Sequence, residues 1–224
     1  MTPQDYVRKN EHWKKINGLH PKMNVYDQTN HGSRIIVDPN YCVGATVANI
    51  YQAQTRKVGD YAKRLYEEGK KRQSEHPDPD TAANADKMGI PIHIVADVAT
   101  ERFGGEYHRI TTLGQVLAWL DNVGPVAAGF IWSEGMAYPQ GRGSWWRRWF
   151  GPKWMTPTHK SGPTTAHCVT ILGGSYKQGG FVVIENSEGL MWGNKGTARL
   201  SWDHLSAMIE GNKVWLYGID FKAK

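Results

Sequence analysis

The sequence predicts an α+β protein with two packed lobes and a cleft between them. Helical patterns occupy the first half of the chain, and five apolar, strand-like runs occupy the second. The 224 residues are 40% hydrophobic, which is enough for the core of one domain or of two close lobes. We expect a single domain over residues 1–224, with a helical lobe over about 25–110 and a β-rich lobe over about 111–224.

The helices of the first half can be placed from local signals. Asn40 belongs to a cluster of helix-start residues, and the run from Cys42 to Tyr51 is apolar on nearly every face, which predicts a buried helix. A second, amphipathic helix is expected around Leu65, with basic side chains on its outer face. The polar segment SEHPDPDTAANADKMG then leads into a short helix. Thr112 can cap a further helix, because LGQVLAWLDN carries apolar residues at three- and four-residue spacing.

Strand-like runs make up the second half. In chain order they are PVAAGFIW, TAHCVTILGG, FVVIENS, TARLSW and KVWLYGIDF. Within the second run, alternation places His167 and Val169 on one face and Cys168 on the other. We therefore expect Cys168 to point away from whatever His167 contacts and to pack as a small hydrophobic side chain.

Composition narrows the class of protein. The formal charge is +6, yet a solvated basic face accounts for it, and no nucleic-acid-binding motif accompanies it, so no nucleic-acid partner is expected. Two cysteines without a C-x-x-C pair are too few for a disulfide scaffold or a structural zinc site. The chain has no apolar run of the roughly 18 to 20 residues that a membrane span needs, and its polar start does not resemble a signal peptide. We expect a cytoplasmic protein, or one that is delivered without an ordinary signal peptide.

Three residues offer the parts of a thiol hydrolase. Cys42 stands at the expected N-terminus of a buried helix, where the helix dipole and backbone N–H groups favour the reactive thiolate. His167 lies in an apolar strand, and Asn186 lies where the next strand should stop. These residue types can serve as nucleophile, general base and orienter of the base. The alternatives are a structural histidine bonded to a backbone carbonyl and an Asn in an ordinary glycine-rich turn.

The same residues carry a resemblance to papain-like cysteine peptidases. That family has an N-S-W-G-x-x-W-G-x-x-G motif at its catalytic Asn, which the segment NSEGLMWGNKG resembles. AHCVTILGG is similar to the family's histidine strand, and GPVAAGFIW to its GPV strand. The matching positions of the Asn motif are Asn186, Ser187, Gly189, Trp192, Gly193 and Gly196. The resemblance runs from about residue 25 to the end, and it implies a helical N-terminal lobe, a barrel-like antiparallel β lobe and an active site in the cleft between them.

Three features depart from the family pattern. The family's oxyanion Gln lies shortly before its Cys, whereas YDQTNHGSR places Arg34 where that Cys would come. We favour an insertion that leaves Gln28 as the oxyanion donor, with Asn40 or a backbone group as the alternative. Glu188 replaces a Trp of the family motif, which predicts an Asn–His hydrogen bond less shielded from water. The family's disulfides and long propeptide have no counterpart in the sequence.

The resemblance implies a cysteine peptidase that acts on protein or peptide substrates. Cys42 would attack the carbonyl carbon, and His167 would protonate the leaving amine. Asn186 would orient His167, and Gln28 would bind the oxyanion. No metal or organic cofactor is implied, and a bacterial or phage enzyme with a narrow protein target fits better than a digestive protease. The alternatives are a catalytically silent papain-like binding protein, which the displaced Gln and Glu188 favour, and a Cys-His peptidoglycan amidase or endopeptidase.

The segment GRGSWWRRWFGPKWMTPTHKSG, residues 141–162, interleaves large aromatic residues with arginines and lysines. In papain-like enzymes the corresponding connection borders the cleft. Our hypothesis is an exosite that grips an acidic or aromatic partner. Contact with an anionic membrane surface is one alternative, and simple packing of the aromatic side chains on the β lobe is the other.

Overall fold

The computed structural model describes residues 41–57, 59–83, 89–141, 152–156, 165–175, 180–187 and 192–221. The helices are α2 (Cys42–Thr55), α3 (Tyr61–Ser74), α4 (Pro79–Ala83), α5 (Ile92–Phe103), α6 (Leu113–Asn122), α7 (Glu134–Ala137) and α9 (Trp202–Glu210). The strands are β1 (Glu106–Ile110), β2 (Val126–Trp132), β3 (Gln140–Gly141), β4 (Lys153–Trp154), β5 (Thr165–Ser175), β6 (Phe181–Glu185), β7 (Thr197–Ser201) and β8 (Val214–Asp220). Within these ranges, no helix is both long enough and apolar enough to cross a membrane.

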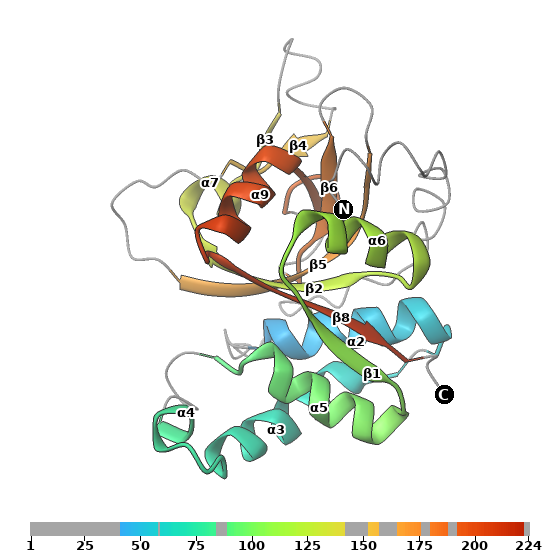
Figure 1. The fold of residues 1–224 in the computed structure, drawn as a ribbon, viewed down its shortest axis with the longest axis vertical. Coiled ribbons are helices and arrows are strands. Elements are labelled where there is room, and N and C mark those ends of the chain that lie inside the picture. Colours follow the sequence, from blue (N-terminus) through green and yellow to red (C-terminus); the bar gives the residue numbers. More distant parts are fainter. Residues whose placement is uncertain are drawn as a thin grey trace.

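The described strands form one sheet of eight, in the order β1-β8-β2-β5-β6-β7-β4-β3. Neighbouring strands are antiparallel except for β4 and β7, which run parallel. In Figure 1, α2 to α5 gather below β2 and β8, while α6, α7 and α9 lie above them. The central strands therefore lie between two groups of helices.

Two hydrophobic clusters lie on opposite faces of the central strand β5. Val169 and Ile171 belong to the cluster that includes apolar side chains of α6 and α9. Cys168 belongs to the other cluster, which includes apolar side chains of α2, α3 and α5. Successive residues of β5 thus face different clusters, which confirms the alternation that the sequence predicts for this strand.

The helix α2 is buried because its residues are small and apolar on nearly every face, as the sequence predicts. The helix α3 approaches it closely at Gly44, where a Cβ atom would lie 2.5 Å from the carbonyl oxygen of Ala62. Near the end of α2, the side chain of Gln54 donates from Nε2 to the carbonyl oxygen of Ile219 at 2.6 Å. Its Oε1 accepts from the backbone N–H of Phe221 at 2.8 Å. These contacts fix α2 between α3 and the end of β8.

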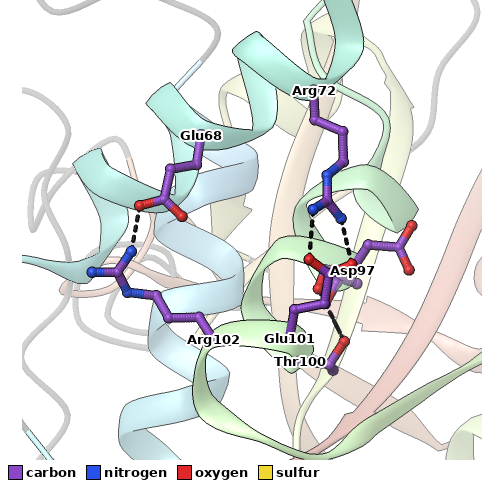
Figure 2. Close-up of polar contacts among 7 residues, drawn as sticks. Glu68, Arg72, Asp97, Thr100, Glu101 and Arg102 are labelled. Carbon is purple, nitrogen blue, oxygen red and sulfur yellow. Dashed lines mark hydrogen bonds and ion pairs between the residues drawn. The ribbon is translucent and has the colours of Figure 1, made fainter. Parts of the chain in front are cut away.

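Two ion pairs join the outer surfaces of α3 and α5 (Figure 2). Arg72 donates to both carboxylate oxygens of Glu101, at 2.8 and 2.5 Å, and Arg102 donates to Glu68. The hydrogen bond from the Arg72 guanidinium lowers the pKa of Glu101 from its ordinary value. All four side chains are well exposed to solvent, so these pairs orient the two helices more than they stabilise the fold.

The α+β fold class predicted from the sequence is confirmed. The helices α2, α3 and α6 and all five predicted strands occur, and the Thr112 hydroxyl caps α6 by accepting from the Gln115 N–H at 3.1 Å. Local patterns do not predict α5 at its full length, β1 or α9. β1 has only one buried residue, so it lacks the alternation that marks a strand. The helix α9 begins directly after the strand run TARLS, with Ser201 as its cap.

Candidate active site

Cys42 is the first residue of α2, where the sequence predicts it. Its side chain is 9% exposed, and Sγ accepts a hydrogen bond from the backbone N–H of Cys168 at 3.4 Å. The sulfur of Cys42 therefore lies at the N-terminal end of a helix and in contact with a backbone N–H donor. Both cysteines are free thiols, so neither is consumed in a disulfide.

His167 and Asn186 are joined by a hydrogen bond. The β5 alternation turns the His167 side chain away from Cys168, and its Nε2 lies 2.7 Å from Asn186 Oδ1. An amide oxygen only accepts, so Nε2 carries a hydrogen and Nδ1 is the basic nitrogen of the neutral ring. His167 is 8% exposed and Asn186 is fully buried, which keeps water from competing for the bond.

A glycine-rich turn explains how Asn186 is held just beyond the end of β6. The backbone N–H of Asn186 donates to the carbonyl oxygen of Gly196 at 3.0 Å. Gly193 has φ +60°, and a Cβ atom there would lie 2.2 Å from the carbonyl oxygen of Thr197. Gly196 has φ +82°, a conformation that residues with side chains rarely adopt. The two glycines therefore allow the tight backbone that positions Asn186.

A tryptophan ring packs against the histidine. The ring of Trp132, at the end of β2, packs edge-on against His167 with 4.6 Å between ring centroids. Trp192 lies 6.2 Å from Trp132 and is itself buried. Glu188, on which the prediction of weaker shielding rests, lies outside the described residues, so that point stays a prediction. Trp132 comes from a strand that is distant in sequence, so the Asn motif alone does not reveal it.

A cavity of about 510 Å³ opens beside Cys42 and His167. One part of its lining is apolar and includes Ile92, the first residue of α5, and Ile90 just before the helix. The other part is aromatic and charged. Its lining residues are Cys42, Val43, Gln73, Asp80, Thr81, Gly89, Ile90, Pro91, Ile92, His93, Arg109, Gly129, Ala166, His167, Cys168, Trp215 and Tyr217. Arg109 donates to the Tyr217 hydroxyl at 3.0 Å, which holds both side chains at one wall.

Cys168 lies in the middle of β5, in the same helical cluster as Cys42. It is 4% exposed and packs among the apolar side chains of the helical cluster. Burial, followed by the proximity of Cys42, raises the pKa of the Cys168 thiol. A thiol with a raised pKa forms little thiolate at neutral pH, so Cys168 is a poor nucleophile.

Sequence reasoning missed a buried polar contact next to these residues. Glu185 immediately precedes Asn186, is 3% exposed, and accepts through Oε2 from Asn49 Nδ2 at 3.3 Å. Asn49 lies on α2, two turns beyond Cys42. The signal was present in the sequence, because an acidic residue ends the apolar run FVVI and an amide interrupts an apolar helix.

Several predicted positions lie outside the described residues. Gln28 and Asn40, the two candidate oxyanion donors, are among them, as is most of the segment 141–162. In the described part of that segment, Trp154 is in β4 and packs edge-on against Phe181 at 5.6 Å. Met155 beside it is fully buried. Packing on the β lobe thus accounts for these two residues, and the exosite hypothesis for the rest of the segment stays a prediction.

The sequence matches no model of a known protein family and no curated protein. The fold is similar to that of xylellain, a cysteine protease from Xylella fastidiosa, with a TM-score of 0.60 and 14% identity over 90% of this chain and 84% of that chain. It is also similar to a digestive procathepsin L2 proteinase from the larval midgut of Tenebrio molitor, with a TM-score of 0.58 and 13% identity over 93% of this chain and 66% of that chain. The chain therefore has the fold of papain-like cysteine proteases.

Proposed function

We propose that this protein is a cysteine peptidase that hydrolyses peptide bonds with Cys42 as nucleophile. One observation carries the proposal: Cys42 and His167 line the same cavity, while His167 Nε2 lies 2.7 Å from Asn186 Oδ1. This arrangement supports the roles of nucleophile, base and orienter. The likeness in fold to two cysteine proteases supports the same class of reaction.

In the proposed reaction, Cys42 Sγ attacks the carbonyl carbon of the substrate after His167 Nδ1 takes the thiol proton. The backbone N–H of Cys42, at the start of α2, donates to the resulting oxyanion. Collapse of this intermediate breaks the C–N bond, and the imidazolium gives its proton to the leaving amine. Water then attacks the thioester, with His167 as base, and releases the acid and the free thiol. Asn186 keeps the ring in the tautomer that both steps need.

The cavity beside Cys42 offers a place for a substrate side chain next to the scissile bond. Ile90 and Ile92 give it an apolar wall, and Trp215, which is 39% exposed, adds an aromatic surface. Burial of an apolar substrate side chain against these groups would supply binding energy without involving the reacting atoms. We therefore propose a peptide substrate with an apolar side chain near the cleaved bond.

Hydrolysis of a library of fluorogenic peptides by the full chain tests the proposal. The wild type should cleave peptides with apolar side chains near the bond, and Cys42→Ser should lower kcat/KM by on the order of 10³ or more. Cys168→Ser is the matched control, because it changes the neighbouring thiol and should keep most of the activity. Equal activity of Cys42→Ser and wild type would refute the proposal, as would full loss in Cys168→Ser alone.

A further inference from the structure

Glu185 connects the two elements that carry the candidate catalytic residues. It is the last residue of β6 and its side chain points away from the Asn186 side, toward α2. Its register partner on β5 is Thr170, on the same face as Cys168. Through Asn49 it contacts the helix that begins with Cys42. One buried side chain therefore joins the helix of the nucleophile to the strand end that holds the orienter.

A buried acceptor next to Glu185 has no hydrogen-bond partner among the described residues. Among the described residues, Asn49 Oδ1 and Thr170 Oγ1 are buried and have no hydrogen-bond partner. A carboxylate at Glu185 can only accept, so it leaves Asn49 Oδ1 unsatisfied, whereas the Thr170 hydroxyl can donate as well as accept. A protonated carboxyl group can accept from Asn49 Nδ2 and donate its proton to a neighbouring oxygen such as Asn49 Oδ1. The proton therefore completes the pairing that the geometry leaves unfinished.

Charges around Glu185 do not favour the carboxylate. The titratable groups on the described elements packed against it are Cys42 and Tyr51 on α2, His167 and Cys168 on β5, and Arg199 on β7. None of these groups changes the pKa of Glu185. Burial alone raises that pKa to about 7. Glu185 thus exchanges its proton within the pH range in which a peptidase of this type would work.

We propose that Glu185 is a positioning residue. In its protonated form it pairs with Asn49 and thereby holds α2, which begins with Cys42, in a fixed position relative to Asn186. Loss of the proton places a charge in a buried site where no cation of the described residues forms an ion pair with Glu185. The helix and strand then separate slightly, and the nucleophile and the oriented histidine lose their alignment. This inference rests on the proposed peptidase function for its activity readout but not for its spectroscopic one.

The first test follows the proton itself. Carbon-13 NMR of the full chain with labelled glutamate side chains should show one carboxyl that titrates near pH 7, and Glu185→Gln should remove that signal. The matched control is Glu210→Gln on α9, which is exposed and should leave the signal in place. If every glutamate titrates near its ordinary pKa, the proposal is overturned whether or not the protein is a peptidase.

The second test measures function. If the ionised form is inactive, wild-type kcat/KM should fall about tenfold between pH 6 and pH 8, whereas Glu185→Gln, which stays neutral, should lack this fall. Glu185→Ala should lower kcat at every pH, since it cannot pair with Asn49, so rescue by Gln separates positioning from mere burial. An identical alkaline fall in wild type and Glu185→Gln contradicts the proposal.

Failure of the peptidase proposal gives a different result. If no peptide is cleaved, the rate at which iodoacetamide modifies Cys42 becomes the readout, with the site located by peptide mass. The Glu185→Gln to wild-type ratio of that rate should then differ between pH 6 and pH 8, because only the wild type gains a buried charge. A ratio that is constant across this range contradicts the positioning role.

Discussion

Asn186 and Trp132 act on the same histidine in different ways. Asn186 fixes which nitrogen of His167 carries the hydrogen, through the 2.7 Å contact with Nε2. Trp132 covers the ring from its edge at 4.6 Å between centroids and limits the access of water. The contact with Asn186 determines the tautomer of the ring. The contact with Trp132 strengthens the Asn186–His167 hydrogen bond by keeping water away from it.

Replacing Asn186 by Ala should lower kcat by on the order of 100-fold and leave measurable activity. The reason is that the orienter is lost while nucleophile and base remain. Steady-state hydrolysis of the best library peptide gives the number. Replacing His167 by Ala is the comparison, and it should remove nearly all turnover. An unimpaired Asn186→Ala enzyme would show that the histidine is oriented by another group.

Trp132→Phe should lower kcat several-fold with little change in KM, because the smaller ring leaves the Asn186–His167 hydrogen bond more accessible to water. Trp215→Phe is the matched comparison: Trp215 lines the cavity but is not packed on His167, so KM should rise with kcat nearly unchanged. Parallel effects of both substitutions on KM alone would show that Trp132 is part of the substrate surface and not a shield.

The contact between α2 and α3 depends on a residue without a side chain. A Cβ atom at Gly44 would lie 2.5 Å from the backbone oxygen of Ala62, so the helices would have to separate. At Gly69, the nearest neighbours of a Cβ atom would all be side-chain atoms, and the closest is a methyl group of Val95 at 2.9 Å. Backbone atoms cannot rotate away, whereas a methyl group can.

We therefore predict that Gly44→Ala lowers the free energy of unfolding by about 1–3 kcal/mol, beyond any gain in helix propensity. Gly69→Ala should lower it less. Urea denaturation of the two variants measures the difference. Since α2 carries Cys42, Gly44→Ala should also lower kcat. Equal stability of the two variants would mean that α3 moves freely along α2.

Local elements were predictable where a single stretch of sequence contains all the information. The start of α2 at Cys42, the Thr112 cap and the two faces of β5 follow from neighbouring residues alone. The bond between Gln54 and Ile219 joins residues 165 positions apart, and the bond between Asn49 and Glu185 joins residues 136 apart. Such contacts are set by how α2 packs on the sheet, which no local pattern encodes.

At the scale of the whole molecule, Glu185 makes stability depend on pH. Its pKa is raised by burial from an ordinary 4.5 to about 7, so the folded chain binds more protons than the unfolded chain between these values. The free energy of unfolding must therefore fall as pH rises through this window. The contribution is complete below about pH 4.5 and lost above about pH 7, and it amounts to about 3 kcal/mol.

Urea denaturation at pH 5 and pH 8 measures this effect as a difference between wild type and Glu185→Gln. The wild type should lose stability relative to the variant on going to pH 8, because glutamine has no proton to release. Other groups titrate equally in both proteins and cancel. A difference that does not change with pH would mean that Glu185 keeps an ordinary pKa in the folded state.

The proposed peptidase reaction depends most on Cys42 as the reactive thiol. A peptide with an apolar side chain and a thiol-reactive vinyl sulfone tests this directly, with the modified residue located by peptide mass. We predict one adduct per chain on Cys42, formed much more slowly in His167→Ala, while Cys168 remains unmodified because burial raises the pKa of its thiol. An adduct on Cys168 in the native protein, or none on Cys42 under excess reagent, would contradict the role of Cys42 as the nucleophile.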